Sequence, residues 1–252
     1  MQTKKTIRDF QILGETEDFI AINKPAGIVV NDATTVREDF TIQSLMRDAF
    51  FQDQNFDESE HKEFLMRNGL VHRLDKHTSG VLLLAKKPEF FEKMLLQFKG
   101  REVTKEYLAL CIVDKLPAEK IFVVDAPIQR NERNRTKFSI ASDGRSAVTQ
   151  FEILETFNFD GTRFALVKCF PKTGRTHQIR VHLAAMLMPV AGDIVYSGNI
   201  RSRQLASLVG RQMLHACKLG FKNPINDEQV DLEAPIPSDM QKLIELLRNT
   251  PH

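Results

Sequence analysis

The sequence contains few cysteines and no long apolar run. Cys111, Cys169 and Cys217 are odd in number, far apart and never arranged as C-x-x-C. This pattern indicates neither a disulfide framework nor a zinc site, and it favours reduced side chains in a cytoplasmic protein. No apolar stretch approaches the roughly 18 residues that a membrane span requires, and the charged N-terminus lacks the apolar core of a secretory signal. We therefore predict a soluble protein of the cytoplasm.

Several catalytic patterns are also missing. The chain has no G-x-x-x-x-G-K or G-x-G-x-x-G loop, which argues against nucleotide hydrolysis and dinucleotide chemistry. Ser79 lacks a G-x-S-x-G elbow, so no Ser-His-Asp triad is indicated. His72 and His77 are five residues apart without a partner cluster, so we expect no metal site.

What the chain has is an ordinary globular composition, with 42% hydrophobic and 27% charged residues over 252 positions. We expect a lead-in over residues 1–14 and a single domain over 15–252. A net charge of +2 does not by itself indicate nucleic-acid binding. Its distribution suggests a basic and an acidic face, although solvated charge without a partner explains any single cluster equally well. The basic clusters are 99–105, 130–137 and 168–180, and the acidic ones 53–63 and 227–233.

Apolar patterning predicts more strands than helices. The predicted strands are 19–23, 28–30, 81–85, 107–113, 121–124, 147–154 and 163–170. Helices are predicted at 41–51 after an N-cap at Thr41, at 89–99, after Arg175 up to Pro189, and from a capping box at 238–241 to about Arg248. Consecutive strands without intervening helices favour an α+β fold with a mixed, mostly antiparallel β-sheet flanked by helices.

A dense polar block, H-R-L-D-K-H-T-S-G, occupies residues 72–80 between apolar segments. Polar groups that close to core strands must find partners or line a cleft, because burying them unpaired costs about 1–3 kcal/mol each. An ordinary turn before a strand remains the alternative.

A second polar block, K-T-G-R-T-H-Q-I-R-V-H, occupies residues 172–182. On a helix His177 and Arg180 would share a face, away from a buried stripe formed by Ile179, Leu183, Met186 and Leu187. With Arg175 in the preceding turn, this arrangement offers cationic donors to a carboxylate or a phosphate. A solvated basic helix face remains open as the alternative.

Together the two blocks closely resemble the RluA-type pseudouridine synthases, whose patterns are H-R-L-D-x-x-T-S-G and G-R-x-H-Q-(I/L)-R-x-H. The resemblance extends in order to N-K-P-A-G at 23–27, K-E-Y at 105–107, Gly192-Asp193 and 214–216, and so covers about residues 15–237. It implies a pseudouridine synthase catalytic fold with a central active-site cleft and an isomerisation that needs neither cofactor nor metal. It also leads us to expect a catalytic domain without an S4-like RNA-binding domain.

The resemblance further implies the catalytic residues. Asp75 corresponds to the essential aspartate, which either attacks the ribose C1′ or removes a C2′ proton. Arg175 matches the basic residue that pairs with it. Tyr107 matches a tyrosine that stacks on the target base and serves in the last deprotonation at C5, with a core aromatic as the alternative.

The implied partner is structured RNA, either ribosomal or transfer RNA. Arg73 resembles an arginine that enters the helical stack as the target nucleotide leaves. Lys105, Arg130 and Arg180 are predicted to contact the RNA. Specificity is expected from the loops 31–40, 52–62 and 196–211, and a monomer from the absence of heptads.

Two other classes stay open at this level. A non-catalytic RNA-binding or RNA-folding protein would have no need for Asp75, Tyr107 and Arg175 together. A nucleoside or glycoside hydrolase typically needs a second carboxylate or an acid-base pair, and none accompanies Asp75 in these motifs.

Overall fold

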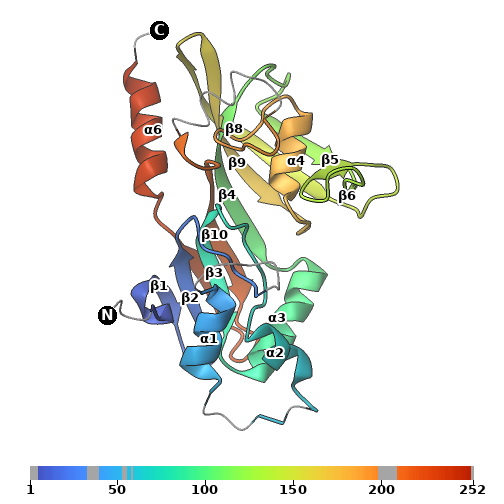
Figure 1. Ribbon diagram of the computed structural model, residues 1–252, viewed down its shortest axis with the longest axis vertical. Coiled ribbons are helices and arrows are strands. Elements are labelled where there is room, and N and C mark those ends of the chain that lie inside the picture. The colour runs from blue at the N-terminus through green and yellow to red at the C-terminus, as the bar shows by residue number, and fades with distance from the viewer. Residues whose placement is uncertain (1–4, 33–39, 53–55, 58, 198–208, 251–252) are drawn as a thin grey trace. The chain divides into compact units, whose positions relative to one another are not determined.

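The computed structural model describes residues 5–32, 40–52, 56–57, 59–197 and 209–250. Parts of the predicted specificity loops, at 33–39, 53–55, 58 and 198–208, lie outside the described residues. The chain forms two compact units, each built from two segments of sequence (Figure 1). Unit 1 comprises Met1–Val103 and Lys218–Pro235, and unit 2 comprises Thr104–Cys217 and Ile236–His252. The interpretation of residues 15–252 as one catalytic domain stays a prediction.

Unit 1 combines antiparallel strands with helices. Its elements are η1 (Ile7–Asp9), β1 (Gln11–Glu15), β2 (Phe19–Lys24), α1 (Ile42–Phe50), α2 (Lys62–Arg67), β3 (Ser79–Ala85), α3 (Pro88–Gly100) and β11 (Gln229–Glu233), with the end of β10 (Leu214–Lys222). Strand β2 pairs antiparallel with both β1 and β3, and β10 forms an antiparallel pair with β11. The two sets share one core, where Phe19 stacks on Phe90 at 5.2 Å and meets Phe221 edge-on at 5.7 Å.

Unit 2 is built around longer antiparallel strands, which are paired side by side in Figure 1. Its elements are β4 (Thr104–Ile112), β5 (Ile121–Asp125), β6 (Ile128–Arg130), β7 (Phe138–Ile140), β8 (Val148–Phe159), β9 (Thr162–Pro171), α4 (Gln178–Ala185), the start of β10 and α6 (Ser238–Asn249). Strand β9 lies between β4 and β8, β5 pairs with β8, and β6 and β7 form a separate hairpin.

Both faces of the unit 2 strands are covered. Successive side chains of a strand point to opposite faces, and in β4 Ala109 packs into a cluster with α4 while Leu108 and Leu110 pack with α6. Helix α4 contributes Ile179 and Leu183 to the first cluster, and α6 contributes Met240, Ile244 and Leu247 to the second. This layered arrangement confirms the predicted α+β class with its mostly antiparallel pairing. None of the helices within the described ranges is long and apolar enough to cross a membrane.

Most predicted elements are confirmed, and the exceptions have physical reasons. The predicted strand 28–30 is wrong: the carbonyls of Val29 and Val30 instead accept hydrogen bonds from Ile42 and Gln43 at the start of α1. They satisfy N–H groups that have no partner inside a helix. The capping box at 238–241 is also wrong, because Pro237 is the N-cap residue and makes no side-chain cap.

Candidate active site

The segment that carries Asp75 is a turn leading into β3. The amide of Thr78 donates to the Asp75 carbonyl at 3.1 Å. Leu74 is buried beneath the turn, Asp75 is half-buried, and Arg73 is exposed. The turn therefore buries its apolar residue and presents its carboxylate and guanidinium at the surface of unit 1. Because exposed and buried side chains alternate along the turn, a polar block can lie directly before the fully buried strand β3.

Lys24, the last residue of β2, fixes this turn from the protein interior. Its side chain is fully buried, and Nζ donates to the carbonyls of Pro25 at 3.0 Å, Ile28 at 3.1 Å and Lys76 at 3.1 Å. The Gly27 amide donates to the same Lys76 carbonyl at 2.8 Å. A buried ammonium is tolerated only when its donors are satisfied. The lysine thus joins the 24–28 loop to the residue that directly follows Asp75.

His72 fixes the other end of the turn. Its Nε2 accepts a hydrogen bond from the Leu83 amide at 2.9 Å, and its ring stacks on Phe98 at 5.1 Å. The imidazole thereby joins the polar block to β3 and α3. Its place in the motif is explained by this anchoring role within unit 1.

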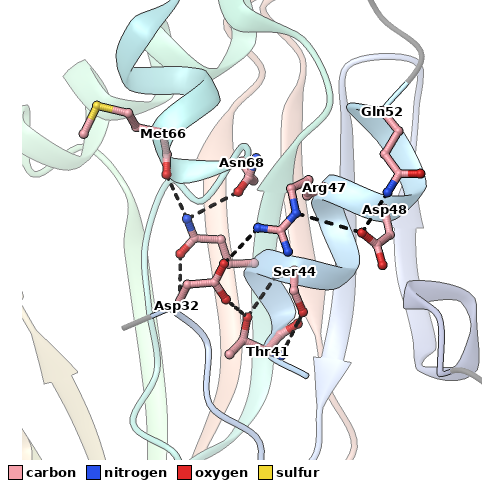
Figure 2. Close-up of polar contacts among 9 residues, drawn as sticks. Asp32, Thr41, Ser44, Arg47, Asp48, Gln52, Met66 and Asn68 are labelled. Atoms are coloured by element: carbon pink, nitrogen blue, oxygen red, sulfur yellow. Dashed lines mark hydrogen bonds and ion pairs between the residues drawn. The ribbon is translucent and has the colours of Figure 1, made fainter. Parts of the chain in front are cut away.

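A polar network braces the same unit at α1, as Figure 2 shows. The amide of Gln43 accepts from the Asp32 backbone at 2.9 Å and donates to the Met66 carbonyl at 2.8 Å and to Asn68 Oδ1 at 3.3 Å. The Asp32 carboxylate accepts from Thr41 Oγ1 and, at 3.1 Å, from Arg47. The network connects the residues before the Asp75 segment to the start of α1.

In unit 2, Lys105 and Tyr107 lie two residues apart on β4 and hence on the same face of the strand. Both side chains are half-buried. Tyr107 packs against the core cluster that includes Ile179 of α4. The intervening Glu106 points to the other face, where it pairs with Lys168 at 3.0 Å and raises the pKa of that ammonium.

The loop of Arg175 is shaped by Gln178, whose amide is buried. Its Oε1 accepts from the Arg175 amide at 2.9 Å and from Thr173 Oγ1 at 2.7 Å. Its Nε2 donates to the Val148 carbonyl at 3.0 Å and to Thr149 Oγ1 at 2.9 Å. Arg175 itself donates from Nε to the Ser146 carbonyl at 3.0 Å. The glutamine of the motif therefore fixes the backbone that carries the arginine.

His182 extends this network into the core. It is fully buried, with Nδ1 3.0 Å from Thr149 Oγ1 and Nε2 3.0 Å from the Ala126 carbonyl. Burial lowers the pKa of its imidazole. A neutral ring in this position joins α4 to β8 and to the segment that precedes β6.

Arg180 is placed differently from the prediction. It does not face away from the core: its side chain is buried and binds Asp193 through two contacts, Nε to Oδ2 at 2.6 Å and Nη2 to Oδ1 at 2.9 Å. Arg180 does lie on the predicted helix, but its guanidinium pairs with the buried carboxylate of Asp193, 13 residues later in the chain. This burial argues against the predicted contact of Arg180 with RNA. The predicted stripe also fails at Leu187, which lies beyond the helix end and is exposed.

The other predicted residues divide between the units. Arg73 and Asp75 belong to unit 1, whereas Lys105, Tyr107, Arg130 and Arg175 belong to unit 2. The pairing of Asp75 with Arg175 and Tyr107 stays a prediction. Sequence reasoning gave no role to Lys24, Gln178 or Tyr196. For Lys24 and Gln178 the available signal was their position inside the N-K-P-A-G and K-T-G-R-T-H-Q-I-R-V-H motifs, where a lysine or glutamine beside apolar neighbours needs an internal partner. Tyr196 lies outside these motifs, and the sequence offered no signal for it.

Comparison with known proteins places this arrangement among known folds and sequences. The family model for RNA pseudouridylate synthase matches residues 18–185. The uncharacterized RNA pseudouridine synthase YlyB of Bacillus subtilis is 38% identical over 240 residues, which are 95% of this chain and 73% of that protein. The ribosomal large subunit pseudouridine synthase D of Xanthomonas campestris is 36% identical over 245 residues, covering 94% and 69%. The structure of human RNA pseudouridylate synthase domain containing 1 matches 99% of both chains with a TM-score of 0.68 at 27% identity.

Proposed function

The chain belongs to the RNA pseudouridylate synthase family, of the RluA type, and we propose that it isomerises specific uridines of structured RNA with Asp75 as its central catalytic residue. Members of this family are isomerases. The proposal for Asp75 rests above all on one observation: its carboxylate lies on a surface turn whose backbone is fixed by the fully buried Lys24. A catalytic group held by rigid neighbours loses little entropy when substrate binds.

The proposed reaction exchanges one glycosidic bond for another. The bond between uracil N1 and ribose C1′ breaks, the base turns while still bound, and a bond forms between C5 and C1′. N1 gains a proton and C5 loses one, so the product has the same atoms as the substrate. Asp75 assists either as a nucleophile at C1′ or as a base at C2′, and both roles require an ionised carboxylate.

We assign the supporting roles to two residues of unit 2. Arg175 is proposed to pair with Asp75, which would keep the carboxylate ionised and orient it. Its loop is suited to this role because Gln178 and Ser146 already fix it. Tyr107 is proposed to stack on the target uracil and to take part in deprotonation at C5.

RNA contacts are proposed for cations that are exposed or half-buried. Arg73 is exposed beside Asp75, as a residue that replaces an extruded base in the stack must be. Lys105 and Arg130 remain candidates for phosphate contacts. For Arg180 we propose a structural role in place of an RNA contact, because its guanidinium is already bound to Asp193.

Large-subunit ribosomal RNA is the proposed substrate. The support is that several similar proteins are named ribosomal large subunit pseudouridine synthase D, among them those of Xanthomonas campestris and Nitrosomonas europaea. Transfer RNA is the alternative to be tested beside it.

The test uses transcripts labelled with tritium at C5 of uridine, since formation of the new bond releases that hydrogen to water. Wild-type protein should release tritium from large-subunit ribosomal RNA, and Asp75→Ala should reduce the rate by at least about 10³-fold. Asp114→Ala, an exposed aspartate outside the motifs, is the matched control. Release by Asp75→Ala at the wild-type rate would refute the role of Asp75, and accumulation of free uracil would indicate hydrolysis. Release from transfer RNA alone would reassign the substrate.

A further inference from the structure

The β6–β7 hairpin presents a basic tip on unit 2. Arg133 and Arg135 are exposed in the loop between the strands. The loop has an internal framework, because Asn131 Oδ1 accepts hydrogen bonds from the amides of Arg133 at 3.1 Å and Asn134 at 2.9 Å. At its base Arg130 lies 5.2 Å from the centre of the Phe138 ring. Cations presented on a formed loop suit an RNA backbone.

Strand β7 of this hairpin is joined to the Arg175 loop by a tyrosine hydroxyl. The Phe138 amide donates to Tyr196 Oη at 2.9 Å, and the same oxygen lies 2.8 Å from His177 Nδ1. His177 is two residues after Arg175. A single hydroxyl group thus bridges the hairpin and the loop of the proposed catalytic arginine.

Strand β6 is joined to the same loop by a second route. Ile128 exchanges backbone hydrogen bonds with Arg145 at 3.0 and 2.9 Å. The next residue, Ser146, accepts the hydrogen bond from Arg175 Nε at 3.0 Å. Strand β7 is therefore connected to the Arg175 loop through Tyr196, and strand β6 is connected to it through Arg145 and Ser146.

Tyr196 is itself held from several sides. Its ring meets His177 edge-on at 5.7 Å, and the Arg180 guanidinium lies 5.0 Å from its centre. Its amide lies 3.3 Å from Asp193 Oδ1, the carboxylate that binds Arg180. The buried Arg180–Asp193 pair therefore holds Tyr196, whose hydroxyl connects the hairpin to the Arg175 loop.

We propose that Tyr196 is a positioning residue, which holds the basic hairpin in a fixed relation to the Arg175 loop so that both act on one RNA. The inference rests on the proposed function, in which Arg175 orients Asp75. It assigns to Tyr196, His177 and the Arg180–Asp193 pair a role in coupling the RNA contacts of the hairpin to the loop of the catalytic arginine.

The test is a double-mutant cycle in RNA affinity, measured with the large-subunit ribosomal RNA transcript. Tyr196→Phe keeps the ring and removes the hydroxyl with both of its hydrogen bonds, to the Phe138 amide and to His177, and it should weaken binding by about 5-fold or more. The pair Arg133→Ala and Arg135→Ala should lower the salt dependence of binding by about 1.4 in the logarithmic slope, for two phosphate contacts to a single strand. If the hydroxyl holds the hairpin, the arginine substitutions should cost clearly less in the Tyr196→Phe background.

A second pair of variants removes folding as an explanation. His177 has a φ of +57°, which glycine and asparagine both accept more easily than other residues. Asparagine keeps a polar atom on the side chain and glycine does not. His177→Asn should therefore retain most of the RNA affinity, whereas His177→Gly should lose as much as Tyr196→Phe. Glu155→Gln, which breaks an exposed ion pair with Arg248 in the same unit, should leave affinity unchanged.

The outcomes separate this inference from the proposed function. Strictly additive effects of Tyr196→Phe and the arginine pair, or equal affinities of His177→Asn and His177→Gly, would overturn the positioning role even if tritium release is normal. Absence of tritium release from the wild-type protein would refute the proposed function alone, since the coupling is measured in binding.

Discussion

At the scale of single residues, Lys24 shows how a buried charge can serve a neighbouring site. Replacing it by Met removes the charged donor that binds three carbonyls, of which the Lys76 carbonyl keeps its bond from the Gly27 amide. We expect Lys24→Met to lower the free energy of unfolding by about 3 kcal/mol, since bonds to a charged donor are stronger than neutral ones. Activity should fall at temperatures where the variant is still folded, because the turn after Asp75 loses its support. Urea denaturation and tritium release measure the two effects.

The matched control for this prediction is Lys62→Met, at an exposed position in the same unit. It should change stability by no more than about 0.5 kcal/mol. Equal stabilities of the Lys24→Met and Lys62→Met variants would contradict the role of the buried ammonium.

His182 predicts a pH dependence of stability. Burial lowers the pKa of its imidazole in the folded protein, so below the unfolded value of about 6.5 the unfolded chain binds the proton more readily. Stability contributed by the neutral ring is therefore present above that pH and is lost as the pH falls from it toward the folded pKa. The slope is at most about 1.4 kcal/mol per pH unit for one proton. Urea denaturation at pH 7.5, 6.5 and 5.5 should show this decrease.

The variant His182→Gln should flatten the slope between pH 7.5 and 5.5. Carboxylates paired in the fold, such as Glu155 with its pKa lowered by Arg248, lose their contribution only at lower pH. His77→Gln, at an exposed ring, should keep the wild-type slope. An undiminished slope in His182→Gln would assign the acid sensitivity to other groups.

At the scale of elements, the sequence predicted those helices and strands whose start and apolar spacing are set by residues within the element itself. The α1 helix was readable because Thr41 caps it, accepting from the Ser44 amide at 3.0 Å, and the apolar spacing follows at once. Residues 28–30 have the same β-branched composition as a strand, yet the carbonyls of Val29 and Val30 accept hydrogen bonds from that helix and the Ile28 carbonyl accepts from Lys24. Composition indicates which secondary structure a segment can form, but the neighbouring segments determine where its backbone hydrogen bonds are made.

The candidate site was predictable only in part. The motif residues Asp75, Tyr107 and Arg175 follow from the resemblance, but the groups that hold them do not follow from spacing. Arg180 has the spacing of a surface cation, and only the fold brings Asp193 to it. Residues that support a site interact across the fold, and such contacts leave no periodic signal.

Turn glycines give a prediction with two internal controls. At Gly69, φ is +75° and an added Cβ would lie 2.1 Å from the Ala85 carbonyl oxygen, so Gly69→Ala should destabilise by several kcal/mol, about 3 or more. At Gly27, φ is +90° but no atom of the described residues lies within 4 Å of an added Cβ, so Gly27→Ala should cost only about 1–2 kcal/mol of backbone strain. Thermal unfolding of both variants measures the difference.

Gly174 supplies the second control. Its φ is not positive, and within the part of the chain that the structure describes no atom lies within 4 Å of an added Cβ. Gly174→Ala should leave stability within about 0.5 kcal/mol of the wild type or raise it slightly. A ranking other than Gly69, Gly27, Gly174 in decreasing cost would contradict this account of the turns.

At the scale of the whole molecule, each unit draws its core from distant parts of the chain. The β10–β11 pair, formed by residues 214–233, contributes Leu219, Phe221 and Leu232 to the core of unit 1. Sequence reasoning did not predict these strands. The two strands pair with each other, but the core residues that they pack against, such as Phe19 and Phe90, lie more than a hundred residues earlier, and no local pattern specifies packing at that separation.

This organisation predicts that residues 1–103 do not fold alone. That fragment lacks Leu219, Phe221, Leu232 and Ala234, which complete the cluster around Phe19. Losing four core side chains removes about 6–10 kcal/mol of burial, comparable to the whole stability of a small domain. The fragment should show no cooperative urea transition and should bind hydrophobic dyes. A version with residues 214–235 attached to Val103 through a flexible linker should regain the transition, because it restores the missing half of the core. Cooperative unfolding of residues 1–103 alone would show that the first segment is an independent folding unit.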